Sequence, residues 1–370
     1  MNPTEEKQVP PEQCKCGNTD FEELKPFYTH QEIELPEIDM QVTHFILHEG
    51  TCRQCGKTVK GKIPDEHRSG YGPRLSALIG DMASIEGNSR SCIREFCESV
   101  LKFPMSLGAI QKVIDRVSEA IKPIYERIGK IVRTSEVNGV DETSWWEKGK
   151  LRWLWVLANA VAAFFMVHER RSREAFEVLI EEWKGVLMSD GYGVYQSWVN
   201  LRQTCLAHLI RDAEWLAERV EVSIQDFGKR GLKLLRRLCS MAHAPPDEKH
   251  WNEFYVELLD LIFDNVQRTD AAGTFARRLL RELDSLWVFL EVAGVEPTNN
   301  RTERILRFGV LWRKRSQGTR CQKGNRWVER ILSLRQTARL RDRSRYDILV
   351  EAVGSYFKRQ PPDLSWLQES

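Results

Sequence analysis

Apolar residues change their spacing along this 370-residue chain, and the spacing predicts where helices and strands lie. From residue 67 to 133 they recur every three or four positions, which is typical of amphipathic helices. Asn88-Ser89 and Ser106 precede two of these helical runs and are expected to cap them. Pro104 separates the two runs, so a helix-turn-helix and an ordinary helical linker are equally good interpretations.

From Thr134 the apolar residues fall into short runs bounded by turn residues, which predicts strands. The five expected strands are Val137–Asp141, Arg152–Ala160, Ala163–His168, Val186–Ser189 and Leu201–Cys205. Turn residues join the first two, so the first three are expected to form an antiparallel meander. Ser172 is expected to cap a helix before the fourth strand, and a helix from Leu206 to Leu216 follows the fifth. This succession is that of a ribonuclease H-like fold.

A second helical stretch interrupts the strand pattern. Residues 221 to about 290 return to a helical period, with Pro245-Pro246 inside them, and we interpret them as an all-helical insertion. A further helix is expected to start near Thr298 and to carry Glu303, and the chain after about residue 325 is helical before a loose, Pro-rich end. The predicted fold class is α/β: a ribonuclease H-like mixed sheet with an all-helical insertion, preceded by a helical segment and a small module described next.

Four of the nine cysteines form two close pairs near the start of the chain, Cys14-x-Cys16 and Cys52-x-x-Cys55, each followed by glycine. Four thiolates at about 2.3 Å make a closed tetrahedral site, so the pairs predict one structural Zn²⁺. The first pair is spaced by one residue instead of the usual two. Alternating apolar positions at Val42, Phe45 and Leu47 predict a small β-rich zinc-binding module. The other cysteines are expected to be buried thiols: Cys92, Cys97, Cys205, Cys239 and Cys321.

The distribution of charge says more than its total. The formal net charge is only +2, but from Arg301 to Arg345 fifteen Lys and Arg stand against three acids. Such a block attracts polyanions, although a solvated helical surface is the alternative. We expect no signal peptide, and the apolar stretch Trp153–Val167 is too short to span a membrane. The uneven, odd-numbered cysteines favour a reducing cytosol, so a cytoplasmic protein is expected.

Three acidic residues stand where they can share metal ions. Asp141 and Asp190 are each expected just after a strand, and Glu303 in the first turns of a helix. Carboxylates at a sheet edge suit two Mg²⁺ ions, which can activate an attacking oxygen and stabilise a leaving one on phosphorus. Taken singly, each has a simpler interpretation: Asp141 and Asp190-Gly191 as turns, and Glu303 as a surface ion pair with Arg307.

Four sequence blocks together resemble the insertion sequence 66 family of bacterial transposases. They are DETSWW (141–146), SDGYGVY (189–195), CLAHLIRDAEWL (205–216) and PTNNRTERILRFGVLWRKRSQG (297–318). The resemblance covers roughly residues 14 to 350, including a zinc-binding segment before the catalytic domain. It implies a DNA transposase with an Asp-Asp-Glu site, in which Asp141 and Asp190 match the two aspartates and Glu303 the glutamate. Water, and then a DNA 3′-hydroxyl, would be the nucleophile, and two Mg²⁺ ions the catalytic cofactors.

The same resemblance suggests weaker assignments around the acids. His208 matches the family's Cys-x-x-His block and is expected to support the site by contacting the scissile phosphate or orienting a carboxylate, a packed histidine being an equal alternative. Asn300 and Arg304 are further supporting candidates, although Asn299 and Asn300 are better explained as helix caps. Core packing is the preferred interpretation of Trp145 and Trp146. The residues expected to bind DNA phosphates are Arg301, Arg307, Arg313, Lys314 and Arg315.

The expected partners are the ends of the mobile element and target DNA, and no membrane is expected to be bound. A homo-oligomer is expected on the DNA, near the nucleoid. Accessory proteins of the same element are further candidate partners. Two other functions compete: a catalytically silent DNA-binding relic or regulator on this fold, and a structure-specific nuclease. The expected segments are a disordered lead-in (1–13), the zinc-binding module (14–64), a helical segment and candidate DNA-binding region (65–133), the first part of the catalytic domain (134–220), the helical insertion (221–296), the glutamate helix with basic C-terminal helices (297–350) and a C-terminal tail (351–370).

Overall fold

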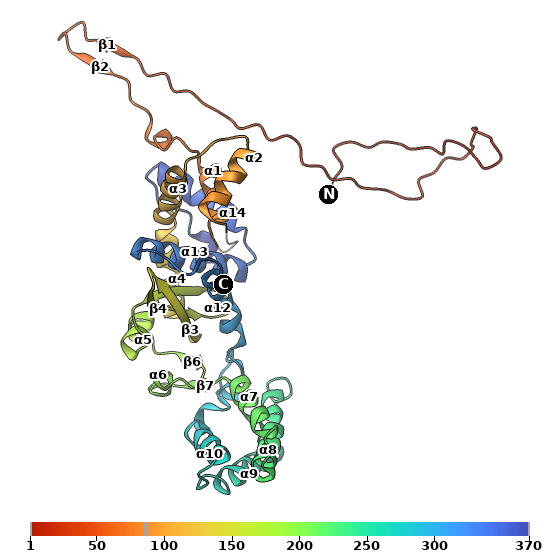
Figure 1. Cartoon of the computed structure of the whole chain (residues 1–370), viewed down its shortest axis with the longest axis vertical. Coiled ribbons are helices and arrows are strands. Elements are labelled where there is room, and N and C mark those ends of the chain that lie inside the picture. The colour runs from red at the N-terminus through yellow and green to blue at the C-terminus, as the bar shows by residue number, and fades with distance from the viewer. Residues whose placement is uncertain (1, 85–87, 369–370) are drawn as a thin grey trace. The chain divides into compact units, whose positions relative to one another are not determined.

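A computed structural model describes residues 2–84 and 88–368, and the chain separates into two compact units, Met1–Val42 and Thr43–Ser370 (Figure 1). Within residues 2–42 no helix or strand forms, and apolar side chains such as Phe27 are exposed. Tight hydrogen bonding is local, as where the Gly17 amide donates to the Cys14 carbonyl over 2.8 Å. The unit has too few buried apolar side chains to offset the entropy of ordering its backbone.

The second unit opens with a short antiparallel hairpin, β1 (Glu49–Thr51) and β2 (Thr58–Lys60), whose turn carries Cys52 and Cys55. The prediction of β structure at Val42, Phe45 and Leu47 was wrong, since these residues lie outside any strand and are exposed. In the described part of the chain no strand pairs with them, and an isolated hairpin is marginal by itself. Cys14 and Cys16 belong to the first unit, so the four-cysteine zinc site stays a prediction from the sequence.

The helical segment contains η1 (Asp65–His67), α1 (Pro73–Met82), α2 (Arg90–Ser99), α3 (Leu107–Ala120) and α4 (Lys122–Thr134). Two predicted caps are confirmed: Ser89 accepts from the Cys92 amide and Ser106 from the Ala109 amide, each over 3.1 Å. These contacts satisfy amides that a helix start leaves without a partner. Helix α3 packs on α1 and on two helices from the end of the chain, α13 (Gln322–Leu340) and α14 (Arg345–Phe357), which favours a core linker over an exposed recognition helix.

A five-stranded mixed sheet forms the centre of the unit, in the order β5-β4-β3-β6-β7. Its strands are β3 (Val137–Glu147), β4 (Lys150–Ala158), β5 (Ala163–His168), β6 (Val186–Ser189) and β7 (Arg202–Thr204). The first three form the predicted antiparallel meander, and β6 and β7 run parallel to β3. This α/β architecture is compatible with the ribonuclease H-like fold expected from the sequence.

One strand boundary differs in a way that matters for the site. Asp141 was expected just past the end of a strand, but β3 continues to Glu147 and Asp141 lies within it. Residues 142–147 stay extended because they pair with β4 across a two-residue turn, in which Lys148 and Gly149 have φ of 50° and 77°. Two successive residues with positive φ suit a tight hairpin that follows the twist of its strands.

Helices cover the sheet. The cap at Ser172 begins α5 (Arg173–Ile180), which packs on β4, and the short α6 (Gly193–Gln196) precedes β7. Helix α12 (Asn300–Ser316) packs on β3 and β4, and α13 (Gln322–Leu340) on β5. Along the outer edge, amides at 163, 165 and 167 donate to side chains of α13: Thr337 at 3.1 Å, Ser333 at 2.9 Å and Glu329 at 2.8 Å. The helix thereby satisfies an edge strand that would otherwise be open to pairing.

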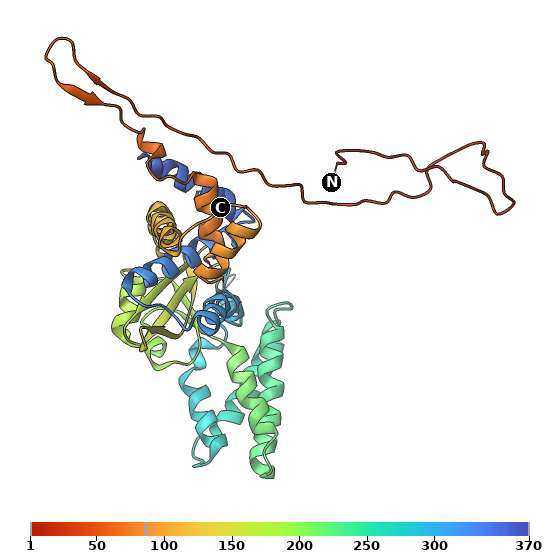
Figure 2. The same ribbon diagram turned by 45° about the horizontal axis from the view of Figure 1, so that its top comes forward.

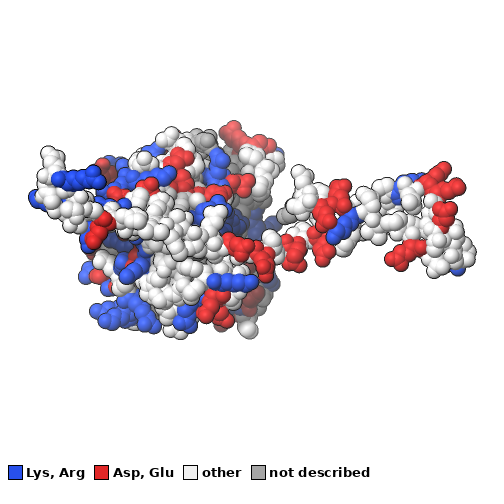
Figure 3. Space-filling model, turned by 90° about the horizontal axis from the view of Figure 1, so that it is seen from above, with Lys and Arg blue, Asp and Glu red and all other residues white. Residues whose placement is uncertain are grey.

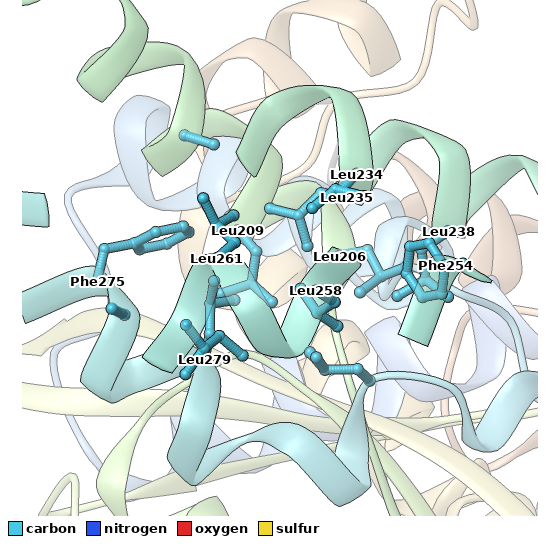
Figure 4. Close-up of a cluster of buried hydrophobic side chains, with 14 of the residues drawn as sticks. Leu206, Leu209, Leu234, Leu235, Leu238, Phe254, Leu258, Leu261, Phe275 and Leu279 are labelled. Carbon is cyan, nitrogen blue, oxygen red and sulfur yellow. The ribbon is translucent and has the colours of Figure 1, made fainter. Parts of the chain in front are cut away.

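The predicted insertion is helical throughout (Figure 2). After α7 (Leu206–Ala217) come α8 (Val222–Ser240), α9 (Glu248–Phe263), α10 (Ala271–Arg281), η2 (Leu283–Ser285) and α11 (Val288–Glu291). Their buried leucines and phenylalanines form one core, in which Leu206 and Leu209 of α7 meet Leu258 and Leu261 of α9 (Figure 4). Met188 of β6 joins the same core, which fastens the insertion to the sheet.

The chain ends with α14 (Arg345–Phe357) and η3 (Ser365–Leu367). Helix α14 continues past residue 350, and Trp366 and Leu367 are buried, with the Trp366 carbonyl accepting from Arg341. The expectation of a loose end was therefore wrong for 365–367, because these apolar side chains reach the core.

Two of the cysteines expected to be buried, Cys92 and Cys321, are exposed, since each lies at the start of a helix. Cys97 and Cys205 are buried, and Cys239 is half-buried. Positive and negative side chains are spread over the face in Figure 3, in agreement with the net charge of +2. Among the residues described, no helix combines the length and the apolar character that crossing a membrane requires.

Candidate functional site

Two of the predicted acids lie level with each other on neighbouring strands. β3 and β6 pair in parallel up to Gly139 and Met188, and extending that register by two residues sets Asp141 beside Asp190. Asp190 directly follows β6, and its side chain accepts from the Tyr192 amide over 3.0 Å. Residues in register on adjacent strands point to the same face of a sheet, so the two carboxylates share one edge region.

The third acid, Glu303, reaches this region because α12 lies unusually close to β3. Gly139 faces the start of the helix, and a Cβ there would lie 2.5 Å from Asn299 Oδ1 and closer still to Thr302 Oγ1. The Asn299 side-chain amide also donates to the Val140 carbonyl over 2.8 Å. Asn299 therefore does not cap α12 with its side chain, as its residue type suggested, but fastens the helix start to the strand. Glu303 follows Thr302 in the first turn.

The pKa of Asp141 reflects its burial and the charges around it. Burial, followed by the negative charges of Glu142, Asp190 and Glu303, raises the pKa of Asp141 to about 8. Desolvation and nearby like charges both disfavour the ionised form of a carboxylic acid. A divalent cation would remove both penalties, so the carboxylates present fit a hard, oxygen-preferring metal ion such as Mg²⁺.

The spacing of the acids bears on how many ions they suit. Among the residues described, one group of three potential ligands has all its ligand atoms within 4.8 Å of one another, and it is Cys205, His208 and Glu303. Asp141, Asp190 and Glu303 form no such compact group. Oxygens on opposite sides of one Mg²⁺ lie about 4.2 Å apart, and two ions about 3.5–4 Å apart extend the reach to roughly 8 Å. One ion bound by all three acids would therefore need their ligand atoms closer together than they lie here.

Glu142 is a fourth acid, directly after Asp141 in β3. Its side chain is 1% exposed, forms an ion pair with Arg171 at 2.5 Å and accepts a hydrogen bond from Tyr195. Burial raises the pKa of Glu142, although Tyr195 and Arg171 both act in the opposite direction. Successive residues of a strand point to opposite faces, so Glu142 supports β3 from the side away from Asp141.

A pocket of about 470 Å³ opens beside Asp190. Two aspartates, three arginines, a tyrosine, a histidine and a glycine line it: Arg171, Asp190, Gly191, Tyr192, His208, Asp212, Arg278 and Arg281. Arg278 of α10 packs against Gly191, where a Cβ would lie 2.7 Å from its Nη2 atom, and pairs with Asp212. The helical insertion thus brings positive charge to the edge of the sheet, which spacing in the sequence did not reveal.

A buried ion pair holds this part of the insertion in place. Glu282, which follows α10, is fully buried and accepts hydrogen bonds from Arg202 and Thr204 of β7 and from Gln196 of α6. Burial acts to raise the pKa of Glu282, but the bonds from Thr204 and Arg202 outweigh it and lower the pKa. The end of α10 is thereby fixed to the strand next to β6.

The predicted phosphate-binding residues differ in their surroundings. Arg301 forms an ion pair with Glu296, and Arg313 donates to Thr143 Oγ1 at 3.0 Å and to the Ser144 carbonyl at 2.6 Å. Both are therefore engaged within the protein. The other predicted phosphate-binding residues are exposed along α12, namely Arg307, Lys314 and Arg315, as are the supporting candidates Asn300 and Arg304. Trp145 is buried in the core, as preferred, whereas Trp146 is 41% exposed.

Comparison with known protein families gives one match. The family model described as Transposase IS66 family matches residues 95–326, a span that contains Asp141, Asp190 and Glu303 and begins after all four paired cysteines. None of the curated proteins matches the chain. The match covers more than half of the chain and includes the whole mixed sheet and the helical insertion. The chain belongs to the IS66 family of transposases.

Proposed function

We propose that this protein cleaves DNA at the ends of an insertion sequence and joins the freed 3′-hydroxyls to target DNA, with Asp141, Asp190 and Glu303 as the catalytic carboxylates on a ribonuclease H-like domain. Family membership supports the transposase role in general. The observation that carries the finer proposal is the geometry: the parallel register of β3 and β6 sets Asp141 beside Asp190, and the close contact of α12 with Gly139 brings the helix of Glu303 to the same strand. Carboxylates gathered at one edge repel one another, and bound divalent cations would offset that repulsion.

The protein's own task in this proposal is to hold oxygen ligands and to orient DNA. Asp141 is fixed by β3, Asp190 by the end of β6, and Glu303 by the close seat of α12 on Gly139. Two Mg²⁺ ions, when bound by these residues, supply stabilisation of the attacking and leaving oxygens on phosphorus. Because the carboxylates stand on a strand, a strand end and a helix, their positions are set before DNA binds.

The exposed cations suggest where DNA phosphates lie. Arg304, Arg307, Lys314 and Arg315 follow α12 away from Glu303, and Arg278 and Arg281 border the pocket at Asp190. Phosphate contacts of this kind position a duplex without reading its sequence. We therefore propose that element-end DNA contacts α12 and the end of α10, and that the active form is a homo-oligomer on DNA.

The test is cleavage of a labelled element-end duplex with Mg²⁺ by the full chain and by Asp141→Asn, Asp190→Asn and Glu303→Gln. Each change is expected to abolish cleavage while leaving DNA binding intact. Glu291→Gln, which alters an exposed acid in α11, is the matched control. Normal cleavage by any of the three variants removes that residue from the site. Wild-type cleavage without strand transfer to a target plasmid identifies a nuclease instead, and DNA binding without cleavage identifies a silent regulator.

A further inference from the structure

Three side chains with different donor atoms converge where α7 and α12 begin. Cys205 precedes α7, His208 lies one turn further along it, and Glu303 lies in the first turn of α12. The two helix starts are joined directly, because the Leu206 amide donates to the Pro297 carbonyl over 2.9 Å and the Asn299 amide to Cys205 Sγ over 3.1 Å. Contacts of the backbone therefore keep the starts of α7 and α12, which carry the cluster, next to each other.

The distances approach those of a metal site. His208 Nδ1 lies 3.6 Å from Glu303 Oε1, Cys205 Sγ lies 4.0 Å from the same oxygen, and all three ligand atoms are within 4.8 Å of one another. Metal bonds of about 2.0 Å to nitrogen and oxygen and about 2.3 Å to sulfur give tetrahedral edges of roughly 3.3–3.5 Å. The two distances to Glu303 Oε1 would have to shorten by a few tenths of an ångström to complete that geometry. The distance between Cys205 Sγ and the His208 nitrogen would have to shorten by more.

The donors are available for a cation. His208 Nδ1 is buried and makes no hydrogen bond to the residues described, although unpaired buried polar atoms are rare and costly. Cys205 is 1% exposed, and its sulfur already accepts a backbone N–H, the contact that favours a metal-bound thiolate. His208 also lines the pocket beside Asp190.

The donor set selects the class of ion. Mg²⁺ takes oxygen ligands, whereas one sulfur, one imidazole nitrogen and one carboxylate suit zinc and related transition metals. We propose that Cys205, His208 and Glu303 form a binding site for a thiophilic divalent cation of the Zn²⁺ class. The inference stands on these three side chains and goes beyond the proposed DNA chemistry. If Glu303 is also a Mg²⁺ ligand, the two kinds of ion compete for it.

Cobalt(II) is the probe, because a thiolate–Co²⁺ bond gives a charge-transfer absorption band that reports on sulfur ligation. Metal-free full-length protein is titrated with CoCl₂ under reducing conditions. Wild type is expected to bind one more Co²⁺ per chain than Cys205→Ser, with a correspondingly stronger band. Cys97→Ser, which alters another buried thiol in α2, is the matched control and is expected to titrate like wild type. The paired cysteines near the start of the chain contribute equally to all three.

A second variant protects the test against a folding defect in Cys205→Ser. His208 is about one-third exposed, so His208→Asn is expected to keep the fold, checked by circular dichroism, and to weaken this Co²⁺ site at least about 100-fold, beyond the 10–100-fold typical of losing an outer-sphere partner. Equal Co²⁺ uptake by wild type, Cys205→Ser and His208→Asn overturns the proposal. That result does not bear on the DNA-cleavage proposal. Conversely, if Glu303→Gln still cleaved DNA, the difference in Co²⁺ binding between wild type and Cys205→Ser would still support the metal site.

Discussion

Gly139 sets the distance between the strand of Asp141 and the helix of Glu303, so a single added methyl group tests how the site is built. A Cβ at this position would lie 2.5 Å from Asn299 Oδ1, whereas ordinary contact begins at about 3.4 Å. Thr302 Oγ1 would lie closer still. In Gly139→Ala the side chains of Asn299 and Thr302 have to give way, and we expect the start of α12 to withdraw from β3 by about 1 Å and to carry Glu303 with it.

The expected cost has two parts. Overpacking of this kind destabilises a protein by about 1–3 kcal/mol, which the fold should survive. A misplacement of about 1 Å in a catalytic group can lower the rate about 100-fold. We expect Gly139→Ala to cleave an element-end duplex roughly 100 times more slowly than wild type, with unchanged DNA affinity. Single-turnover cleavage with Mg²⁺ measures the rate, and urea denaturation measures the stability.

Two further variants make the result interpretable. Gly193→Ala is the matched control, because a Cβ there meets nothing within 4 Å, and it should cleave normally. Adding Thr302→Ala to Gly139→Ala removes the nearer of the two obstructing oxygens and should restore part of the rate. Wild-type cleavage by Gly139→Ala would refute the argument that the close seat of α12 positions Glu303.

Three other outcomes are expected. Glu282→Gln leaves Arg202 buried beside a neutral partner and should destabilise the protein by about 3–5 kcal/mol in urea denaturation. Because the folded pKa of Glu282 lies below the ordinary 4.5, its stabilising contribution is present above pH 4.5 and is lost as the pH falls through the lowered value. The variant should therefore lose this dependence of stability on acid pH, and a pH profile identical to that of wild type would contradict the prediction. Replacing both Arg304 and Arg307 by Ala should weaken DNA binding uniformly across sequences and reduce the slope of log K against log salt by about 2, whereas an unaltered slope would remove these residues from the interface. The zinc site predicted from the cysteine pairs implies that Cys52→Ser with Cys55→Ser lowers the zinc content by one equivalent in elemental analysis, and equal zinc in both proteins would exclude it.

Local signals predicted much of the fold. The strands Val186–Ser189 and Ala163–His168 and the caps at Ser89 and Ser106 follow from patterns of a few residues, because apolar runs and capping hydroxyls act on their immediate neighbours. The extent of β3 could not be predicted in this way, since its second half is a strand only through pairing with β4. The apolar positions at 42–47 alternate as strands do, but they pair with no strand among the described residues.

The candidate site was predictable only in part, for a related reason. Asp141, Asp190 and Glu303 stand in blocks that carry a family resemblance, so the sequence alone nominates them, and their catalytic role stays a prediction. Cys205 was taken as a buried thiol, and it is buried, but its place beside His208 and Glu303 depends on α7 and α12 starting side by side. Arg278 reaches Asp190 only because the insertion folds back, fixed by Glu282. Contacts between segments so far apart in the chain leave no local signal.

The claim that Asp141, Asp190 and Glu303 act together as metal ligands can be measured without a cleavage assay. Crystals of the protein with an element-end duplex, soaked in Mn²⁺ as a substitute for Mg²⁺, give anomalous diffraction that locates bound ions directly. Our account predicts anomalous peaks among these three carboxylates, and their loss at that place in Asp141→Asn. Peaks elsewhere only, or a Glu303 side chain directed away from both aspartates, would contradict it.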